Sequence, residues 1–518
     1  MKHRLLAAAI VLAAIALPFF AQVLENVQAT RYVQHMEAPA LGDLTSQTTL
    51  DCIRPGNGKA GYYAGAVDTA ALRTHLPLLE VQTGGQEIPG GAFWDDSTVT
   101  GIGFTLAPNG ETTIPATLAV RDRANALHSL SDTPTVTADI RIRIRGNSSR
   151  WFDKPSYSVK LVQAGGQNLD IGLLGMEAHH DWVLHGPFLD KTLMRNYMGM
   201  NLSGMLMRFA PDVRFCELVV NGEYRGVYVL METVSKGKGR ADVRAPVSNR
   251  GVTGYIMQFN YDYESVGKEL DTFTGYAKVL KKNVCIALEY PGPSQITPAL
   301  RRYVERDISR VEKVLYSYDY DDPAHGYSQF LDVGEFVDYF LIMELFEMHD
   351  TGNLSTFFYR DVTGKIRPAP WDFNNGADNY SVLAEDDFGV RQFVGVQAPW
   401  FINMLKDEAY VNALIARWRQ LRQSVLSDES LSSFIYGTAA YLGEAVDRNY
   451  AVWGYSFNPA NFEDFRFKLR PDDRNPRSYA ASLTQLETAL LSRANWLDAN
   501  IEALRQYSHE SAVKKLNP

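Results

Sequence analysis

The 518-residue sequence is poor in cysteine, with only Cys52, Cys216 and Cys285. Three thiols allow at most one internal disulfide, so a scaffold held together by several disulfides is excluded. Stability must come from a hydrophobic core, which the 46% of hydrophobic residues can supply. The sequence also lacks an excess of positive charge, because its formal net charge is −9. That balance argues against a general nucleic-acid binder and against an anionic-membrane binder.

Apolar runs that suggest a membrane span are absent after residue 29. Residues 1–29 themselves resemble a targeting segment, with Lys2, His3 and Arg4 before the apolar run Leu5–Phe20. That run is shorter than the roughly 20 residues that a spanning helix needs. A signal peptide and an uncleaved signal anchor are both consistent with it, and both predict a secreted, periplasmic or cell-envelope protein. Only such an anchor would connect the chain to a membrane.

Repeats and low-complexity tails are also absent. Residues 30–72 are polar and contain Pro55-Gly56-Asn57-Gly58, which is typical of an extension or linker. We therefore expect one large compact domain over residues 73–518.

The stretch Met343–Tyr380 is the most informative part of the sequence. It begins at the end of an apolar helix, for which Asp332 and Glu335 form a start similar to a capping box. Apolar side chains cover most sides of that helix, so we expect it to be buried. Polar groups begin at His349, where we expect the helix to have ended.

A β-hairpin should follow, with its turn over Asp361–Gly364. A turn centred there places Asn353 opposite Asp372, and Asp350 lies one short loop away from both. Opposed residues in a hairpin are roughly 5 Å apart at Cβ, close enough to share a metal ion. Two carboxylates and a carboxamide are the oxygen ligands that Mg²⁺ prefers. The structural alternative is that the three residues cap a helix, hold a turn and satisfy local hydrogen bonds.

A strand over Thr137–Arg145 places Arg141, Arg143 and Arg145 on the face opposite its isoleucines. Three arginines on one face are consistent with a solvated edge or with a wall that faces phosphate groups. The turn Gly146–Ser149 follows, and its backbone N–H groups could hold an anion. The next strand places Lys160 on its polar face.

These motifs resemble two related kinds of enzyme. The order of helix, His349-Asp350, Asn353, hairpin and Asp372-Phe373 is similar to the catalytic loop and metal-binding segment of protein kinases. Four segments resemble the spore coat protein H (CotH) family of atypical, secreted protein kinases: RIRGNSSRWFDKPSYSVKL, NGEYRGVYVLME, PWDFNNG and LSRANWLDANI. The resemblance covers roughly residues 75–505.

The resemblance implies an α+β, two-lobed atypical protein-kinase-like fold, with an N-lobe over about 73–255 and a C-lobe over about 256–510. It implies an enzyme that transfers phosphate from ATP, with Mg²⁺ or Mn²⁺, to Ser or Thr of an unknown acceptor protein. Asp350 would be catalytic, and Asn353 and Asp372 would bind the metal. The implied nucleotide-binding residues are Arg145, Gly146, Asn147, Ser148, Lys160 and, at the junction of the lobes, Glu232.

Two departures from the family pattern keep other functions open. Asn374 stands where a second Asp often follows WDF, which removes one charge from the metal site. The helix expected over Lys191–Met207 carries no acid to pair with Lys160, which leaves Glu217 and Glu232 as candidates. A non-catalytic envelope or adhesion protein and a metal-dependent phosphoesterase are the alternatives. The cluster around His179, His180 and His185 matches no zinc spacing.

The N-terminal segment predicts that most of the chain lies outside the cytoplasm. Fractionation of the native host, with the chain detected by a C-terminal epitope, should find it in the envelope or the medium. Recovery from the cytosol with residues 1–29 intact would contradict the expectation.

Overall fold

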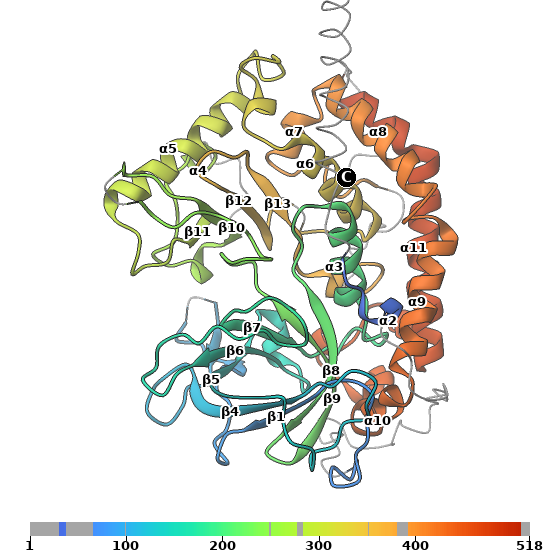
Figure 1. Ribbon diagram of the computed structural model, residues 1–518. Helices are drawn as coiled ribbons and strands as arrows, with labels where there is room; N and C mark the ends of the chain where they lie inside the picture. Colours follow the sequence, from blue (N-terminus) through green and yellow to red (C-terminus); the bar gives the residue numbers. More distant parts are fainter. Residues whose placement is uncertain are drawn as a thin grey trace, which may run out of the picture.

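The computed structural model describes residues 31–37, 66–98, 100–247, 250–276, 283–350, 352–380 and 392–508. Within these ranges the fold is mixed α+β, as expected (Figure 1). In the same ranges, no helix combines the length and the apolar character that crossing a membrane requires. The targeting segment 1–29 and Cys52 lie outside the described residues, and Cys216 and Cys285 are free thiols.

The first half of the chain forms a closed barrel, in the lower part of Figure 1. β1 closes it by pairing antiparallel with β4 and parallel with β8. Side chains that alternate along the strands, such as Ile142, Val159 and Trp182, fill the interior. The strands in spatial order are β1 (Leu78–Gln82), β4 (Ile114–Arg121), β5 (Val136–Arg145), β6 (Ser156–Val162), β7 (Asp181–His185), β9 (Glu223–Glu232) and β8 (Val213–Val220). β2 (Ala92–Trp94) and β3 (Ile102–Phe104) form a separate two-stranded sheet.

The second half contains a four-stranded sheet in the order β11 (Val284–Tyr290), β10 (Tyr255–Tyr261), β12 (Thr356–Arg360) and β13 (Arg367–Ala369). Short α4 (Phe273–Tyr276) and long α5 (Pro298–Leu315) lie beside this sheet. Asp307 of α5 accepts a hydrogen bond from Tyr255 of β10 at 2.9 Å and pairs with Arg360 of β12. The helix is thereby fixed to the two central strands.

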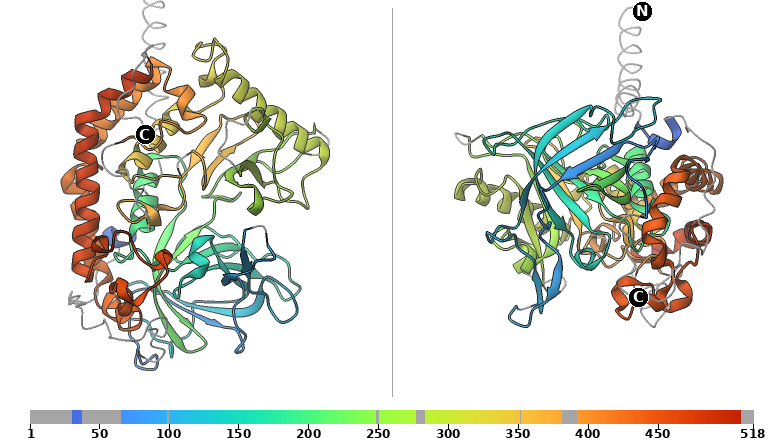
Figure 2. Two further views of the ribbon diagram at one scale, coloured as in Figure 1. Left: turned by 180° about the vertical axis from the view of Figure 1, so that it is seen from behind. Right: turned by 90° about the horizontal axis from the view of Figure 1, so that it is seen from below.

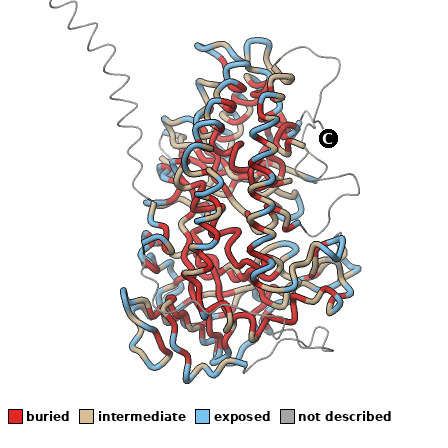
Figure 3. The backbone as a smooth tube through the Cα atoms, turned by 90° about the vertical axis from the view of Figure 1, so that its right-hand side faces the viewer, coloured by how far each residue is buried: buried red, intermediate tan, exposed pale blue. Residues whose placement is uncertain are grey.

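Helices form the remainder of the second half. α11 (Tyr479–Asn500) runs along one side of the molecule in contact with α9 (Asp428–Leu442), as Figure 2 shows from behind. α6 (Val333–Leu345) is almost wholly buried. Figure 3 shows that buried backbone gathers in the interior of the molecule. The second half also contains α7 (Phe401–Met404), α8 (Glu408–Arg422) and α10 (Glu444–Trp453). α3 (Arg195–Leu206) comes from the first half of the chain, between β7 and β8.

The expected capping box at the start of α6 is wrong, although Asp332 does occupy the N-cap position. The side chain of Asp332 makes no capping hydrogen bond and instead accepts one from Arg367 at 2.8 Å. Glu335 accepts the backbone N–H of Arg208 at 3.0 Å. Both acids are therefore used to attach neighbouring segments to the helix.

Part of the expected linker is docked on the folded body. Residues 31–37, which include the short α2 (Gln34–Glu37), lie against α3 and β8. Arg31 donates to the carbonyl groups of Ala210 and Pro211 at 3.0 and 2.6 Å, and Gln34 accepts the N–H of Phe215 at 2.7 Å. The expectation of a linker over 30–72 is therefore wrong for this part, because its polar side chains satisfy backbone groups of the body.

Contacts across the barrel attach it to α10. Lys154 is buried and donates to the carbonyl of Val227 and to the side chain of Asn449, both at 2.7 Å. Arg448, also on α10, holds the buried carboxylate of Glu217 through two hydrogen bonds of 2.9 Å. Two charged side chains of the barrel thus depend on partners more than 200 residues later.

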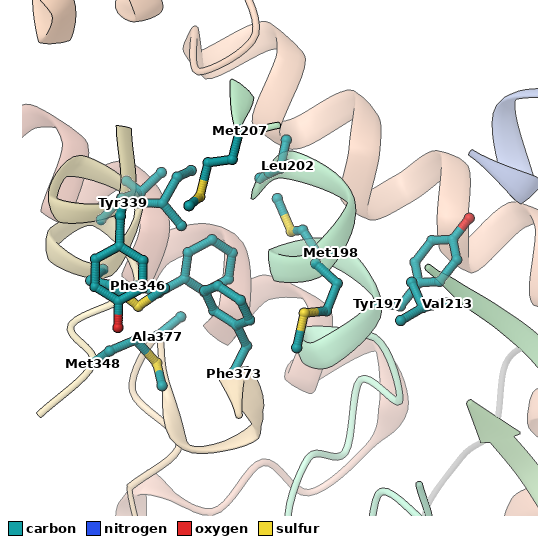
Figure 4. Close-up of a cluster of buried hydrophobic side chains, with 14 of the residues drawn as sticks. Tyr197, Met198, Leu202, Met207, Val213, Tyr339, Phe346, Met348, Phe373 and Ala377 are labelled. Carbon is teal, nitrogen blue, oxygen red and sulfur yellow. The ribbon is translucent and has the colours of Figure 1, made fainter. Parts of the chain in front are cut away.

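α3, α6 and the segment after β13 meet in an apolar cluster, in which Phe373 lies between Met198 and Phe346 (Figure 4). Gly199 makes room for this arrangement, since a Cβ added there would lie 2.2 Å from the Phe373 ring. The packing fixes the residue that follows Asp372.

α6 and α11 are joined by a fully buried ion pair. Arg493 donates to the Glu344 carboxylate at 2.7 Å and to its backbone carbonyl at 2.8 Å. The same carboxylate accepts the N–H groups of Gly395 and Val394 at 2.7 and 3.0 Å. Both side chains are 0% exposed, so neither charge can be satisfied by water if its partner is removed.

Arg493→Met should lower the free energy of unfolding by about 3–5 kcal/mol, because it leaves the Glu344 carboxylate buried without its cation. Urea denaturation followed by tryptophan fluorescence measures the loss. The matched control is Arg419→Met, which breaks an exposed pair with Glu502 and should cost less than about 1 kcal/mol. Equal losses in the two variants would contradict this interpretation.

Candidate functional site

The candidate site lies where the open end of the β12–β13 hairpin meets the β5–β6 end of the barrel. The hairpin pairs Phe357 with Ala369. Extended in this register, it places Asp372 opposite Leu354. The expected pairing of Asn353 with Asp372 is therefore wrong by one residue.

The one-residue shift in register arises between the turn and the start of β13. The turn itself is where the sequence places it, because the Gly364 N–H donates to the Asp361 carbonyl at 3.1 Å. Ile366, however, forms a parallel bridge with Leu331 before β13 begins at Arg367. This second partner shifts the returning strand by one position.

Asp372 is half-buried and has a left-handed backbone, with φ of 69°. Its carboxylate accepts a hydrogen bond from Ser355 and lies near the guanidinium of Arg145. Burial raises the pKa of Asp372 above its ordinary value, and Arg145 and Ser355 offset part of that rise. Arg145 also lies 5.6 Å from the ring centroid of Trp371. The structure thus brings together an arginine of the barrel and an aspartate of the hairpin.

Asp350 ends the short segment after α6. Its carbonyl accepts the N–H groups of Asn353 and Leu354, both at 2.9 Å. The negative charge of its carboxylate contributes to a raised pKa in three nearby tyrosines, Tyr261, Tyr339 and Tyr380. Burial, followed by nearby negative charges that include Asp350, raises the pKa of Tyr261 to about 12. Burial and then Asp350 also raise the pKa of Tyr380, which is 37% exposed.

Asn353 is buried, at 7% exposed, and belongs to the same tight turn as Asp350. Thr356 holds that turn, since its hydroxyl accepts the Gly352 N–H and donates to the Leu354 carbonyl, both at 2.9 Å. Asn353 therefore lies two residues from Ser355, which contacts Asp372. Asp350, Asn353 and Asp372 thus come from two segments that meet where Ser355 contacts Asp372.

The turn after β5 carries the predicted nucleotide-binding residues. Gly146 has φ of 116°, and a Cβ there would lie 1.8 Å from the Ser149 hydroxyl, so only glycine fits. Its carbonyl accepts a hydrogen bond from Arg150. Asn147 reaches Tyr263, just after β10, at 3.4 Å. Ser148 begins a short 3₁₀ helix, Ser148–Trp151.

Three arginines gather at this turn. Burial, followed by the positive charges of Arg143 and Arg145, lowers the pKa of Arg150 to about 10. Burial also lowers the pKa of Arg145, while Asp372 raises it and Arg143 lowers it further. The negative charge of Glu264 raises the pKa of both Arg145 and Arg150. The mutual repulsion of these guanidinium groups would be relieved by a bound polyanion.

Lys160 shares the outer face of the barrel with Arg145 but lies further along the hairpin. It pairs across the sheet with Arg141 and Asp181, whereas Arg145 pairs with Ser156. Lys160 lies four positions after Ser156, which is roughly 13 Å along a strand. The structure does not bring Lys160 against Asp372, and it places Asp181 beside its ammonium group.

Neither Glu217 nor Glu232 is the partner of Lys160, so that expectation is wrong. Glu217 is held by Arg448. Glu232 accepts the Asp212 N–H at 2.9 Å and lies 3.5 Å from Arg240. The reason is strand alternation, because Glu232 pairs with Trp182 of the barrel interior while Lys160 pairs with Asp181 of the outer face.

The histidine cluster divides into two places. His179, His180 and Asp181 have side-chain ligand atoms within 4.8 Å of one another. Both nitrogens of His179 are used, since Nδ1 accepts the Asp181 N–H at 2.9 Å and Nε2 lies 3.2 Å from the Lys236 carbonyl. A metal there would have to displace a backbone group.

The sequence interpretation grouped His185 with the other histidines and did not place it near Arg145. Its Nδ1 lies 3.4 Å from the hydroxyl of Ser156, opposite Arg145 in the sheet. Its Nε2 is buried and has no hydrogen-bond partner in the part of the chain that the structure describes. Burial lowers the pKa of His185 to about 4, so the ring is neutral near pH 7. Strand alternation over Asp181–His185 could have placed it on the outer face.

Arg195, at the start of α3, holds the segment that follows Asp372. It is 1% exposed and forms a 2.6 Å ion pair with Asp190. It donates to the carbonyl groups of Gly376 and Ala377 at 3.1 and 3.0 Å. The next residue of α3, Asn196, donates to the side chain of Asn374 at 3.4 Å. Asn374 is therefore directed toward α3.

This arrangement can carry out one kind of chemistry especially well. A cluster of arginines can bind phosphate oxygens, and oxygen ligands on the facing loops suit a hard divalent cation. Asp350 stands among phenols beside those ligands and can accept a proton from a bound hydroxyl.

Comparison with curated proteins gives no match. The family model described as CotH kinase protein matches residues 142–497, from within β5 to within α11. The matched span contains Arg145, Lys160, Asp350, Asn353 and Asp372, and it covers most of the chain. The chain therefore belongs to the CotH kinase protein family.

Proposed function

We propose that this protein is an exported phosphoryl transferase that uses ATP and Mg²⁺ or Mn²⁺ to phosphorylate Ser or Thr of envelope or extracellular proteins. In this proposal the fold is kinase-like, with the barrel as N-lobe and the second sheet with its helices as C-lobe. Membership of the CotH kinase family supports it. ATP would lie between the two lobes.

The proposal rests mainly on one observation, the proximity of the Arg145 guanidinium to the Asp372 carboxylate. The two residues come from different halves of the chain, and each perturbs the other's pKa. In phosphoryl transfer the phosphates need cationic groups on one side and a metal ion held by acids on the other. Arg145, Arg150 and the Gly146 turn supply the first, and Asp372 with Asn353 supplies the second.

The chemical step assigns one task to each group. The acceptor hydroxyl oxygen forms a bond with the γ-phosphorus of ATP while the bond from that phosphorus to the β–γ bridging oxygen breaks, and ADP leaves. Asp350 orients the hydroxyl and takes its proton. The bound cation would neutralise phosphate charge, and the carboxylate of Asp372 and amide oxygen of Asn353 are ligands of the right type for it. Lys160 would bind the more distant part of the nucleotide.

The two alternatives differ in what they need. A phosphoesterase would transfer the phosphoryl group to water, and an adhesion protein would need no nucleotide. Asn374 and the lack of a glutamate partner for Lys160 are the two features that favour a non-catalytic protein. The contact of Asn374 with Asn196 weakens the first argument, because the Asn374 side chain is directed toward α3. The proposed ligands Asp372 and Asn353 do not depend on a charge at that position.

Asp350→Asn and Asp372→Asn should have different effects. Asp350→Asn should reduce phosphoryl transfer by about 10²-fold or more while Mg²⁺–ATP affinity is kept, because it removes only the proton acceptor. Asp372→Asn should weaken Mg²⁺–ATP binding, because it takes a charged oxygen from a hard cation. Calorimetric titration with Mg²⁺–ATP and a labelled-phosphate transfer assay measure the two effects.

The melting temperature of both variants serves as the control for folding. Asp361→Asn, in the turn of the same hairpin, is the matched variant, and it should leave nucleotide binding and transfer unchanged. If Asp350→Asn and Asp372→Asn behave alike in affinity, transfer and stability, the assigned roles are wrong. Release of inorganic phosphate without transfer to any acceptor would favour the phosphoesterase.

Arg145→Gln should weaken ATP binding by about tenfold or more, because one charge-assisted hydrogen bond contributes about 1.5–3 kcal/mol. Lys160→Ala should also weaken it while leaving the fold intact. Nucleotide titration alongside thermal unfolding tests both variants, with Lys365→Ala as a control on an exposed lysine. Unchanged ATP affinity in Lys160→Ala would show that Lys160 is not part of the site. Unchanged ATP affinity in Arg145→Gln would contradict the proposed nucleotide site, which rests on the proximity of Arg145 to Asp372.

A further inference from the structure

A second concave surface lies on α5, apart from the site described above. It is a cavity of about 770 Å³, and none of the proposed catalytic, metal-binding or nucleotide-binding residues lines it. In Figure 1, α5 lies on the outer side of the molecule, opposite α11. Four cations of α5 dominate its lining, and we call this surface the α5 groove: Arg302, Arg306, Arg310 and Lys313.

The four cations form a single stripe. Their spacing of four, four and three residues places them on one face of the helix, and all four are exposed. At 1.5 Å per residue the stripe is roughly 16 Å long. Glu305 is the acid closest to them in sequence on this face, but it binds Arg301 at 3.1 Å and the Asp271 N–H at 3.3 Å.

Within the described ranges, none of the four forms an ion pair with a carboxylate. Arg306 donates only to the carbonyl of Arg302 in its own helix, at 3.1 Å. Arg310 lies over the ring of Phe330, at 4.7 Å from its centroid. Their positive charge is therefore available to a ligand.

This stripe works against the stability of the helix. Like charges four residues apart repel each other, and cations in the first turn oppose the helix dipole. The first turn of α5 contains no acid, and Arg301 and Arg302 lie near it. The buried face of Leu300, Val304 and Ile308 keeps the helix in place despite this repulsion. A local conflict in a chain of net charge −9 is the kind of feature that marks a binding surface.

We propose that the α5 groove binds an acidic segment of the acceptor protein, an inference that rests on the proposed kinase function. An extended peptide rises about 3.4 Å per residue, so about five residues would span the stripe. Charge complementarity selects a segment rich in Asp and Glu.

Other anionic ligands fit less well. Among the described residues that line it there is no Trp, Tyr or Phe on which a nucleic-acid base could stack. Val314 is the one aliphatic side chain in that lining, which is too little apolar surface for insertion into a membrane.

The groove is also connected to the site. Asp307, on the opposite face of α5, bonds to Tyr255 of β10 and pairs with Arg360 of β12. β12 begins six residues after Asp350. A peptide held in the groove would therefore be fixed relative to the strand that leads from Asp350.

The test is a triple variant with Arg302→Glu, Arg306→Glu and Arg310→Glu in the full chain. A fluorescent peptide rich in glutamate with one serine is titrated by anisotropy, and its affinity should fall at least about tenfold. A second variant with Gln at the same positions should show a smaller loss. The matched control changes three exposed arginines elsewhere, Arg123, Arg250 and Arg477, to Glu and should bind as the unchanged protein does. The melting temperature confirms folding in each case.

Three results would overturn the proposal: equal peptide affinity in both triple-Glu variants, equal affinity for a peptide with Gln in place of Glu, or tighter groove-dependent binding of phosphatidylglycerol vesicles or of an oligonucleotide. Kinetics separate this proposal from the proposed function. The α5 variant should keep Mg²⁺–ATP affinity and kcat and raise only KM for an acidic acceptor. If the unchanged protein transfers no phosphate, the proposed function fails, while the peptide titration still decides whether the groove binds acidic chains.

Discussion

The buried guanidinium of Arg195 is the interaction on which the candidate site most depends. It is balanced by Asp190 and aimed at two carbonyl groups of the segment after Asp372. That segment contains two residues with left-handed backbone, Ala377 and Asp378. Without a fixed donor behind it, its backbone carbonyls would be buried without partners, which is costly. Arg195 therefore holds the backbone at Gly376 and Ala377, four and five residues after Asp372.

A second constraint is the placing of opposite charges on the two halves of the chain. The barrel contributes Arg143, Arg145 and Arg150, and the hairpin contributes Asp372. Repulsion within the arginine cluster and burial of Asp372 leave both sides incompletely satisfied when they face only each other. Such a site is organised for a ligand that carries negative charge toward the barrel and a cation toward the hairpin.

Local patterns were enough to predict much of the fold. Alternation in β5 and β6, the turn over Asp361–Gly364 and the apolar character of α6 all identified their elements. The parallel pairing of β1 with β8 was not predictable, because it joins strands 130 residues apart without a local signal. The hairpin register failed because Ile366 takes a partner outside the hairpin, at Leu331. Asp350 and Asp372 could be singled out from residue type and order, whereas the role of Arg195 depends on tertiary contacts.

The way in which the barrel is closed also has a consequence for the order of folding. β1 cannot find its parallel neighbour until β8 has been made, and loop closure over such a length slows folding. Even then, Lys154 remains buried without its amide acceptor until Asn449 of α10 arrives. A growing chain therefore has all seven barrel strands once Glu232 has been made, but Lys154 lacks one of its two acceptors until α10 follows. The first half of the chain therefore reaches its full set of polar contacts only when α10 of the second half is present.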